Sequence, residues 1–83
     1  MYTVYELRVE LALPHVRTLN RIGARVVEWE PFPDAFTEIY ILKEANATRI
    51  YELLQELAVV SGTRIRKRVA TKLPFELSRV KSS

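Results

Sequence analysis

The chain has 83 residues, of which 48% are hydrophobic and 28% charged, a composition that predicts one small globular domain with one core. It contains no cysteine, which excludes disulfides, cysteine-ligated zinc or iron–sulfur centres and thiol catalysis. No apolar run reaches the roughly 18 residues that a membrane span needs, and residues 1–6 lack the basic and apolar segments of a signal peptide. We therefore expect a soluble, cytoplasmic protein.

The net charge of +3 conceals a strong asymmetry along the chain. Residues 1–60 carry six Lys and Arg against nine Asp and Glu, whereas residues 61–83 carry seven against one. A basic excess confined to one end predicts an acidic partner, either nucleic acid or the surface of another protein. Arginine also outnumbers lysine nine to four, and only two glycines are present, a pattern that leans toward a thermophilic source.

Apolar and charged residues alternate at the start of the chain, as they do in a strand with one buried face. The apolar positions are Tyr5, Leu7, Val9 and Leu11, and the charged residues Glu6, Arg8 and Glu10 lie between them. A short helix is expected next, because Pro14 suits a first helical turn and apolar residues recur at helical spacing as far as Ile22. Gly23 is expected to end this helix.

Two further strands are expected at residues 25–29 and 35–43, and we expect them to pair as a hairpin. The segment between them, Glu30 to Asp34, contains two prolines, which do not fit a central strand. Asn46 is then predicted to cap a second helix, which Gly62 ends. Apolar residues share one face of that helix: Ile50, Leu53, Leu54, Leu57 and Ala58.

A fourth strand is expected at residues 63–73, ended by Pro74. Its alternation places Ile65, Val69 and Leu73 on one side and Arg64, Arg66, Arg68, Ala70 and Lys72 on the other. Residues 1–76 are therefore predicted to form the domain, and residues 77–83 a basic, loosely ordered tail.

The element order β-α-β-β-α-β predicts an α+β fold, a ferredoxin-like two-layer sandwich. In it, a four-stranded antiparallel sheet carries both helices on one face and leaves the other face open. The second half, Trp29 through Val69, resembles the small effector-binding modules of the ACT and RAM (regulation of amino-acid metabolism) families in its hairpin, single amphipathic helix and last strand. The resemblance implies a regulatory module that binds a small metabolite at its dimer interface, and it assigns no ligand residues here.

The residues that catalysis requires are few in this chain. There is one histidine, His15, and one aspartate, Asp34, and the two isolated glycines cannot form a phosphate-binding loop. His15 reads either as a solvated residue of a first helical turn or as a ligand, and no metal-ligand spacing supports the second interpretation. We therefore expect a protein that is not an enzyme and uses no cofactor or metal.

A basic set near the end of the chain is the main candidate site. Arg64, Arg66 and Arg68 are predicted on the open face of the sheet, where ferredoxin-like RNA-binding domains hold single strands. With Lys67 and Lys72 they would contact phosphates, and Arg79 and Lys81 lie beyond them. Phe36 and Tyr40 are predicted on the same face as stacking groups. This set predicts binding of RNA or DNA, or of a nucleoprotein partner.

Two other interpretations of the open face remain. Glu6, Arg8 and Glu10 would face the arginines, with Glu38 one strand further on, and form a charge network that neutralises much of their field. The apolar residues Val4, Val26, Tyr40 and Leu42 would instead form a homodimer interface. Trp29 reads as a core or core-edge aromatic residue, or as a ligand contact. A structural subunit of a larger assembly is a further alternative.

Overall fold

The computed structural model of the chain describes residues 1–29, 36–74 and 79–81. The described elements follow the expected order and add a short strand at the end. They are β1 (Tyr2–Leu7), α1 (Leu13–Arg21), β2 (Ala24–Trp29), β3 (Phe36–Ile41), the 3₁₀ turn η1 (Glu44–Asn46), α2 (Ala47–Ser61), β4 (Arg66–Ala70) and β5 (Arg79–Lys81). The predicted segment 30–34 between the hairpin strands, with Asp34, lies outside the described residues.

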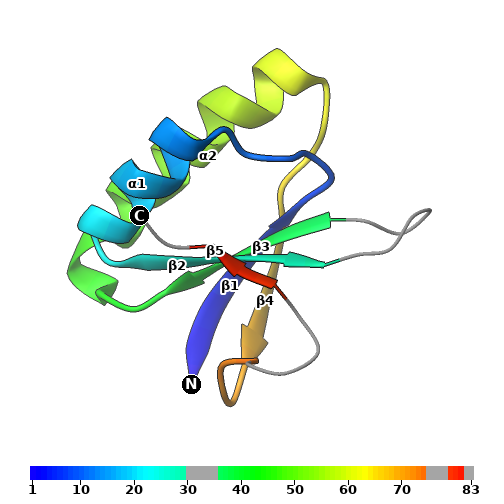
Figure 1. The fold of residues 1–83 in the computed structure, drawn as a ribbon. Helices are drawn as coiled ribbons and strands as arrows, with labels where there is room; N and C mark the ends of the chain where they lie inside the picture. The colour runs from blue at the N-terminus through cyan, green and yellow to red at the C-terminus, as the bar shows by residue number, and fades with distance from the viewer. Residues whose placement is uncertain (30–35, 75–78, 82–83) are drawn as a thin grey trace.

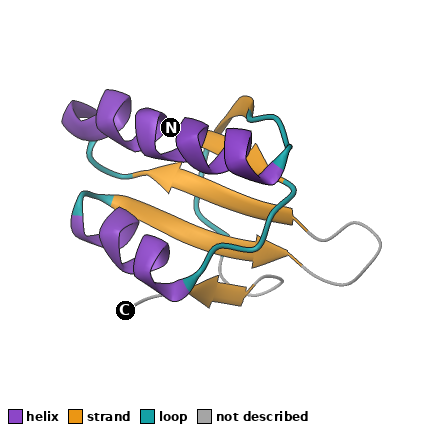
Figure 2. Cartoon of the chain, turned by 90° about the horizontal axis from the view of Figure 1, so that it is seen from above, coloured by secondary structure: helices purple, strands orange, loops and turns teal. Residues whose placement is uncertain are grey.

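The strands form one antiparallel sheet in the order β4-β1-β3-β2-β5. Both helices lie against one face of this sheet (Figure 1), and the view from above shows them side by side over the strands (Figure 2). The α+β class is confirmed, and the arrangement is compatible with the predicted ferredoxin-like fold. The prediction of four strands misses β5, which lies within the expected tail and pairs with β2.

Both glycines adopt the positive φ that helix ends favour, with φ 100° at Gly23 and 68° at Gly62. The predicted ends of both helices are thus confirmed. The predicted N-cap position of Asn46 is confirmed, but its side chain makes no capping hydrogen bond to α2. Its Nδ2 instead donates to the carbonyl oxygen of Ile22 over 2.6 Å and so caps the end of α1.

The main core lies between the helices and the sheet. Side chains from β1, β2 and β3 meet Val16 and Leu19 of α1 and Ile50, Leu54 and Ala58 of α2 there. The strand residues in this core are Tyr5, Leu7, Ala24, Val26, Ile39 and Ile41. The apolar alternation of β1 and the apolar face of α2 therefore pack as the sequence predicts.

A second apolar cluster covers part of the face that is expected to be open. Val4, Val27 and Tyr40 are buried there, and Tyr2, Trp29, Ala70 and Leu73 pack against them. The chain thus turns onto this face after β4, since Leu73 comes three residues after the strand ends. We call this side the cluster face; it is not simply open to solvent.

The two faces of β2 are the reverse of those predicted. Val26 lies in the helix-side core, whereas Val27 and Trp29 lie on the cluster face. The expected place of Val26 at the open face is therefore wrong. Both parities of the strand are apolar, so alternation along β2 alone cannot decide which one faces the helices.

Candidate nucleic-acid interface

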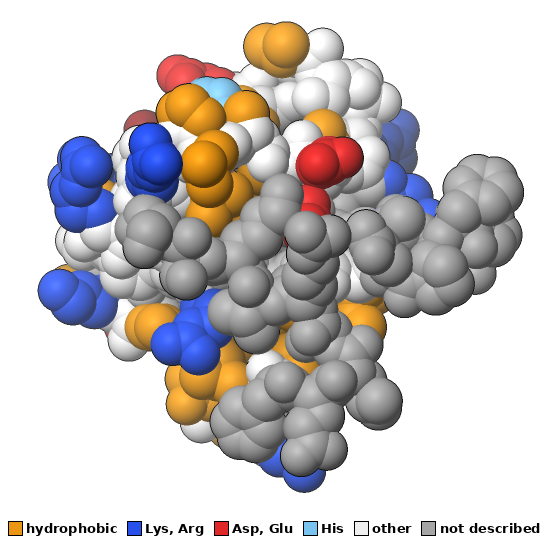
Figure 3. Space-filling view, viewed as in Figure 1, with side chains coloured by type: hydrophobic (Ala, Val, Ile, Leu, Met, Phe, Trp, Pro, Cys, Tyr) orange, Lys and Arg blue, Asp and Glu red, His pale blue; other side chains and the backbone are white. Residues whose placement is uncertain are grey.

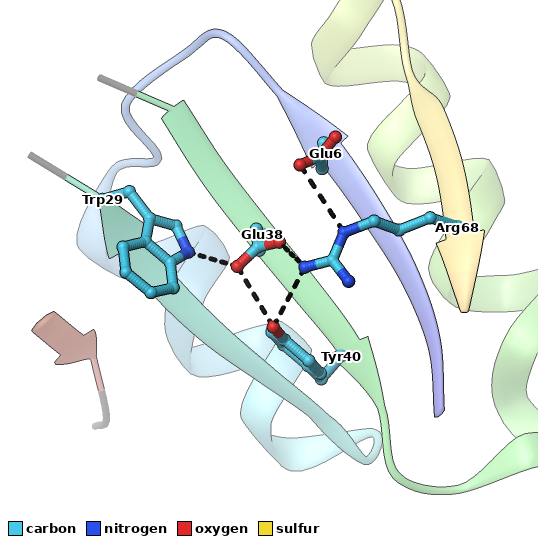
Figure 4. Close-up of polar contacts among 5 residues, drawn as sticks. All are labelled: Glu6, Trp29, Glu38, Tyr40 and Arg68. Atoms are coloured by element: carbon cyan, nitrogen blue, oxygen red, sulfur yellow. Dashed lines mark hydrogen bonds and ion pairs between the residues drawn. The ribbon is translucent and has the colours of Figure 1, made fainter. Parts of the chain in front are cut away.

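A buried carboxylate organises the centre of the cluster face. Glu38, only 1% exposed, accepts hydrogen bonds from Trp29 Nε1 and from the Tyr40 hydroxyl, the latter over 3.1 Å. Arg68 Nη2 donates to the other carboxylate oxygen of Glu38 and, over 3.2 Å, to the Tyr40 oxygen (Figure 4). Arg68 Nε also lies 3.6 Å from Glu6 Oε2. We call these five residues the Glu38 network.

The register of the sheet explains why an arginine is needed in this network. Glu6 and Glu38 are direct partners across β1 and β3, an arrangement that is repulsive for two carboxylates. Arg68 on β4 reaches over β1 and bonds to both carboxylates, as the sticks in Figure 4 show. A buried carboxylate is tolerated only when it is paired and hydrogen-bonded, and the network meets both conditions.

The ionisation of the network residues reflects this packing. Burial acts to lower the pKa of Arg68, but its hydrogen bonds to Glu38 and Tyr40 outweigh that effect and raise the pKa above its ordinary value. Burial raises the pKa of Tyr40, although the hydrogen bond from Arg68 opposes the rise. Arg68 therefore stays charged and pairs with Glu38 within the chain.

A basic groove lies beside the network, where β1 ends and β4 begins. It has a volume of about 560 Å³ and is lined by Glu6, Leu7, Arg8, Phe36, Thr63, Arg64 and Arg66. Its three arginines are exposed and face one glutamate, which already lies near Arg68. We call it the arginine groove. Its charge and its aromatic wall suit an anionic ligand that carries flat rings.

A pair of aromatic rings adjoins the arginine groove. Trp29 and Phe36 are partners across β2 and β3, and their rings stack with centroids 6.1 Å apart and an interplanar angle of 20°. A smaller hollow of about 260 Å³ runs along them and shares Arg8 and Phe36 with the arginine groove. Glu10 and Glu28 also line this hollow, so its lining is less basic than that of the arginine groove.

The structure brings only part of the predicted nucleic-acid set together. Arg64, Arg66 and Phe36 share the arginine groove, while Arg68 and Tyr40 belong to the Glu38 network. Lys67 lines a groove on the helix side of the sheet. Lys72 lines a further hollow, of about 380 Å³, together with Tyr40 and Arg68.

Sequence reasoning placed Arg8 on the face of the arginines but left it out of the phosphate-contacting set, and it did not place Trp29 on this face. Arg8 follows β1 directly and continues the alternation of Glu6, and the structure brings it into the arginine groove with Arg64 and Arg66. Trp29 was missed because the faces of β2 are reversed. The side chains of Arg79 and Lys81 lie outside what the structure describes.

The four predicted dimer-interface residues do not form one surface. Val4 and Tyr40 are buried in the cluster face, Val26 is buried in the helix-side core, and Leu42 is 42% exposed. In the space-filling view, Lys and Arg side chains lie at several places around the rim of the molecule, with hydrophobic side chains exposed between them (Figure 3). Dimer formation stays a prediction, and these residues give it no shared patch.

No family model, curated protein or solved structure matches this chain. Among residues 1–29, 36–74 and 79–81, no three His, Asp or Glu side chains gather as a metal site would require. None of the helices in the described part of the chain is long and apolar enough to cross a membrane. His15 lies half-buried in the first turn of α1.

Proposed function

We propose that this protein is a non-enzymatic binding protein with a ferredoxin-like fold that holds single-stranded nucleic acid in the arginine groove. The observation that carries the proposal is the convergence of Arg8, which follows the end of β1, and of Arg64 and Arg66, just before and at the start of β4, on one groove walled by Phe36. Guanidinium groups bind phosphates in a forked geometry and also stack on bases. The proposal names Arg8 in place of Arg68, because Arg68 is bound to Glu38.

Single strands are favoured over duplexes because the groove combines charge with an accessible ring. Bases of a single strand are free to stack on an aromatic side chain, whereas those of a duplex are stacked on each other. Phe36 is half-buried and backed by Trp29, whose indole nitrogen is tied to Glu38. The ring is therefore held in place before a ligand binds, which lowers the entropic cost of binding.

Fluorescence anisotropy of labelled single-stranded oligonucleotides tests the proposal. If the three arginines each contact a phosphate, raising the salt concentration from roughly 50 to 200 mM should weaken binding about 20-fold. Each contact contributes about −0.7 to the slope of log K against log salt concentration. Replacing Arg8, Arg64 and Arg66 together with alanine should remove most of that slope. A duplex of the same length should bind more weakly than the single strand at each salt concentration.

A matched variant separates groove binding from general charge attraction. Arg17, Arg21 and Arg49 are exposed on the helices, so replacing these three with alanine removes the same net charge away from the groove. This variant should keep most of the affinity and the full salt slope. Equal losses in the two triple variants, or no binding of wild type at low salt, would contradict a nucleic-acid site in the groove.

A regulatory module that binds a small metabolite is the second candidate, and one observation favours it. A groove of about 570 Å³ on the helix side is lined by Thr3, Tyr5, Glu44, Ala47, Thr48, Tyr51, Ile65 and Lys67. Tyr5 is only 7% exposed, and its hydroxyl has no hydrogen-bond partner among the residues that the structure describes. A metabolite that binds there should raise the melting temperature of wild type but not of a Tyr5→Phe variant.

A further inference from the structure

We propose that β4 accepts an extended acidic segment of another protein as an added strand, so that the sheet continues past its β4 edge. This inference does not rest on the nucleic-acid proposal, although it uses two of the same side chains, Arg64 and Arg66. Of the described strands, β4 pairs with β1 alone and ends the sheet on that side. In a strand, alternate residues direct their backbone N–H and C=O groups to the free side, so β4 presents a ladder without a partner.

The side chains of β4 determine which strand this edge can accept. Arg66, Lys67 and Arg68 follow one another and are all exposed. A second copy pairing antiparallel through the same edge would bring these cations opposite one another, which is repulsive. The edge therefore disfavours self-association and selects a strand of opposite charge.

Both sides of this edge are hollowed, which suits the alternating side chains of an incoming strand. On one side lies the arginine groove with Arg64 and Arg66. On the other side, the helix-side groove contains Tyr51, Ile65 and Lys67, and Val69 nearby is 57% exposed. An added strand would direct every second residue to each side. The structure thus favours a segment in which acidic residues, facing the arginines, alternate with apolar residues, facing Tyr51 and Val69.

Two peptides of equal charge test this proposal on the full-length protein. The first is an extended peptide of about nine residues in which Glu alternates with Val, long enough to cover the strand. The second replaces its central Val with Pro, which cannot donate a ladder hydrogen bond and disfavours the strand. Anisotropy should show at least about tenfold tighter binding of the first peptide. Hydrogen exchange should slow at alternate amides of β4 only when the first peptide is bound.

Charge-reversed proteins provide the matched control. Arg66→Glu reverses a charge that the acidic residues of the peptide would face, whereas Arg49→Glu makes the same change at an exposed position of α2. Only the first variant should weaken binding of the strand peptide. Equal affinity of the two peptides would show that charge attraction alone explains binding. Unchanged hydrogen exchange in β4 would show that the peptide binds elsewhere. Either result overturns the proposal. Slowing of the same amides by an oligonucleotide alone would assign the edge to nucleic acid instead, with the same consequence.

Discussion

At the residue scale, the Glu38 network shows how one buried charge determines the roles of its neighbours. Glu38 is 1% exposed and accepts from three donors, so removing any donor leaves part of a buried carboxylate unsatisfied. Arg68 matters most among them because it supplies the only opposite charge that the described residues bring to Glu38. A side chain that the sequence suggests for phosphate binding thus has a structural role.

Arg68→Ala should therefore destabilise the protein by roughly 2–4 kcal/mol, as expected when a buried charge loses its partner. Glu6→Gln is the matched test of the same cluster: Glu6 is partly exposed and 3.6 Å from Arg68, so its loss should cost less than about 1 kcal/mol. Urea unfolding of the two variants measures the difference in the free energy of unfolding. Similar costs for both would show that Glu38 does not depend on Arg68.

At the element scale, Gly23 and Gly62 each end a helix, but the space around their Cα atoms differs. A Cβ at Gly23 would lie 2.6 Å from the Cβ of Lys43, whereas a Cβ at Gly62 would meet nothing within 4 Å. The carbonyl oxygen of Gly23 also accepts hydrogen bonds from the amides of Leu42 and Lys43, over 2.8 and 3.0 Å, so this close approach ties the α1–β2 turn to the end of β3.

Gly62→Ala should thus cost about 1 kcal/mol, the strain of a left-handed conformation alone. Gly23→Ala should cost roughly 3 kcal/mol, because the same kind of strain is joined by a clash with Lys43. Thermal and urea unfolding of the two variants give the comparison. A Gly62→Ala variant as unstable as Gly23→Ala would show that crowding at Lys43 adds nothing.

The success of sequence reasoning also depended on the element. The faces of β1 and α2 could be predicted because apolar and polar residues separate cleanly along them. The faces of β2 could not, because Val26 and Val27 are equally apolar and only the packing of the helices decides between them. The Glu38 network and the arginine groove depend on strand order and register, which join residues some 30 to 60 positions apart and leave no local pattern.

At the scale of the whole molecule, each face of the sheet buries a tyrosine that titrates abnormally. Burial, followed by the nearby Tyr51 and Glu44, raises the pKa of Tyr5 on the helix side, and burial raises the pKa of Tyr40 on the cluster face. In the unfolded chain both tyrosines have the ordinary pKa of 10.0, so each phenol keeps its proton to a higher pH in the folded state than in the unfolded state. The stability that this difference contributes is fully present below pH 10.0.

The free energy of unfolding should consequently fall as the pH rises from about 10 through the folded-state pKa values of the two tyrosines, because the unfolded chain loses its phenolic protons first. Urea unfolding between pH 8 and 11.5, approximately the range in which tyrosine ionises, measures this slope, and the tyrosinate absorbance reports ionisation in the folded protein. Tyr5→Phe and Tyr40→Phe should each reduce the slope, and the double variant should reduce it further, because the two hydroxyls lie on opposite faces and titrate independently. A slope that is unchanged in the double variant would assign the alkaline loss of stability to other groups, such as the lysines.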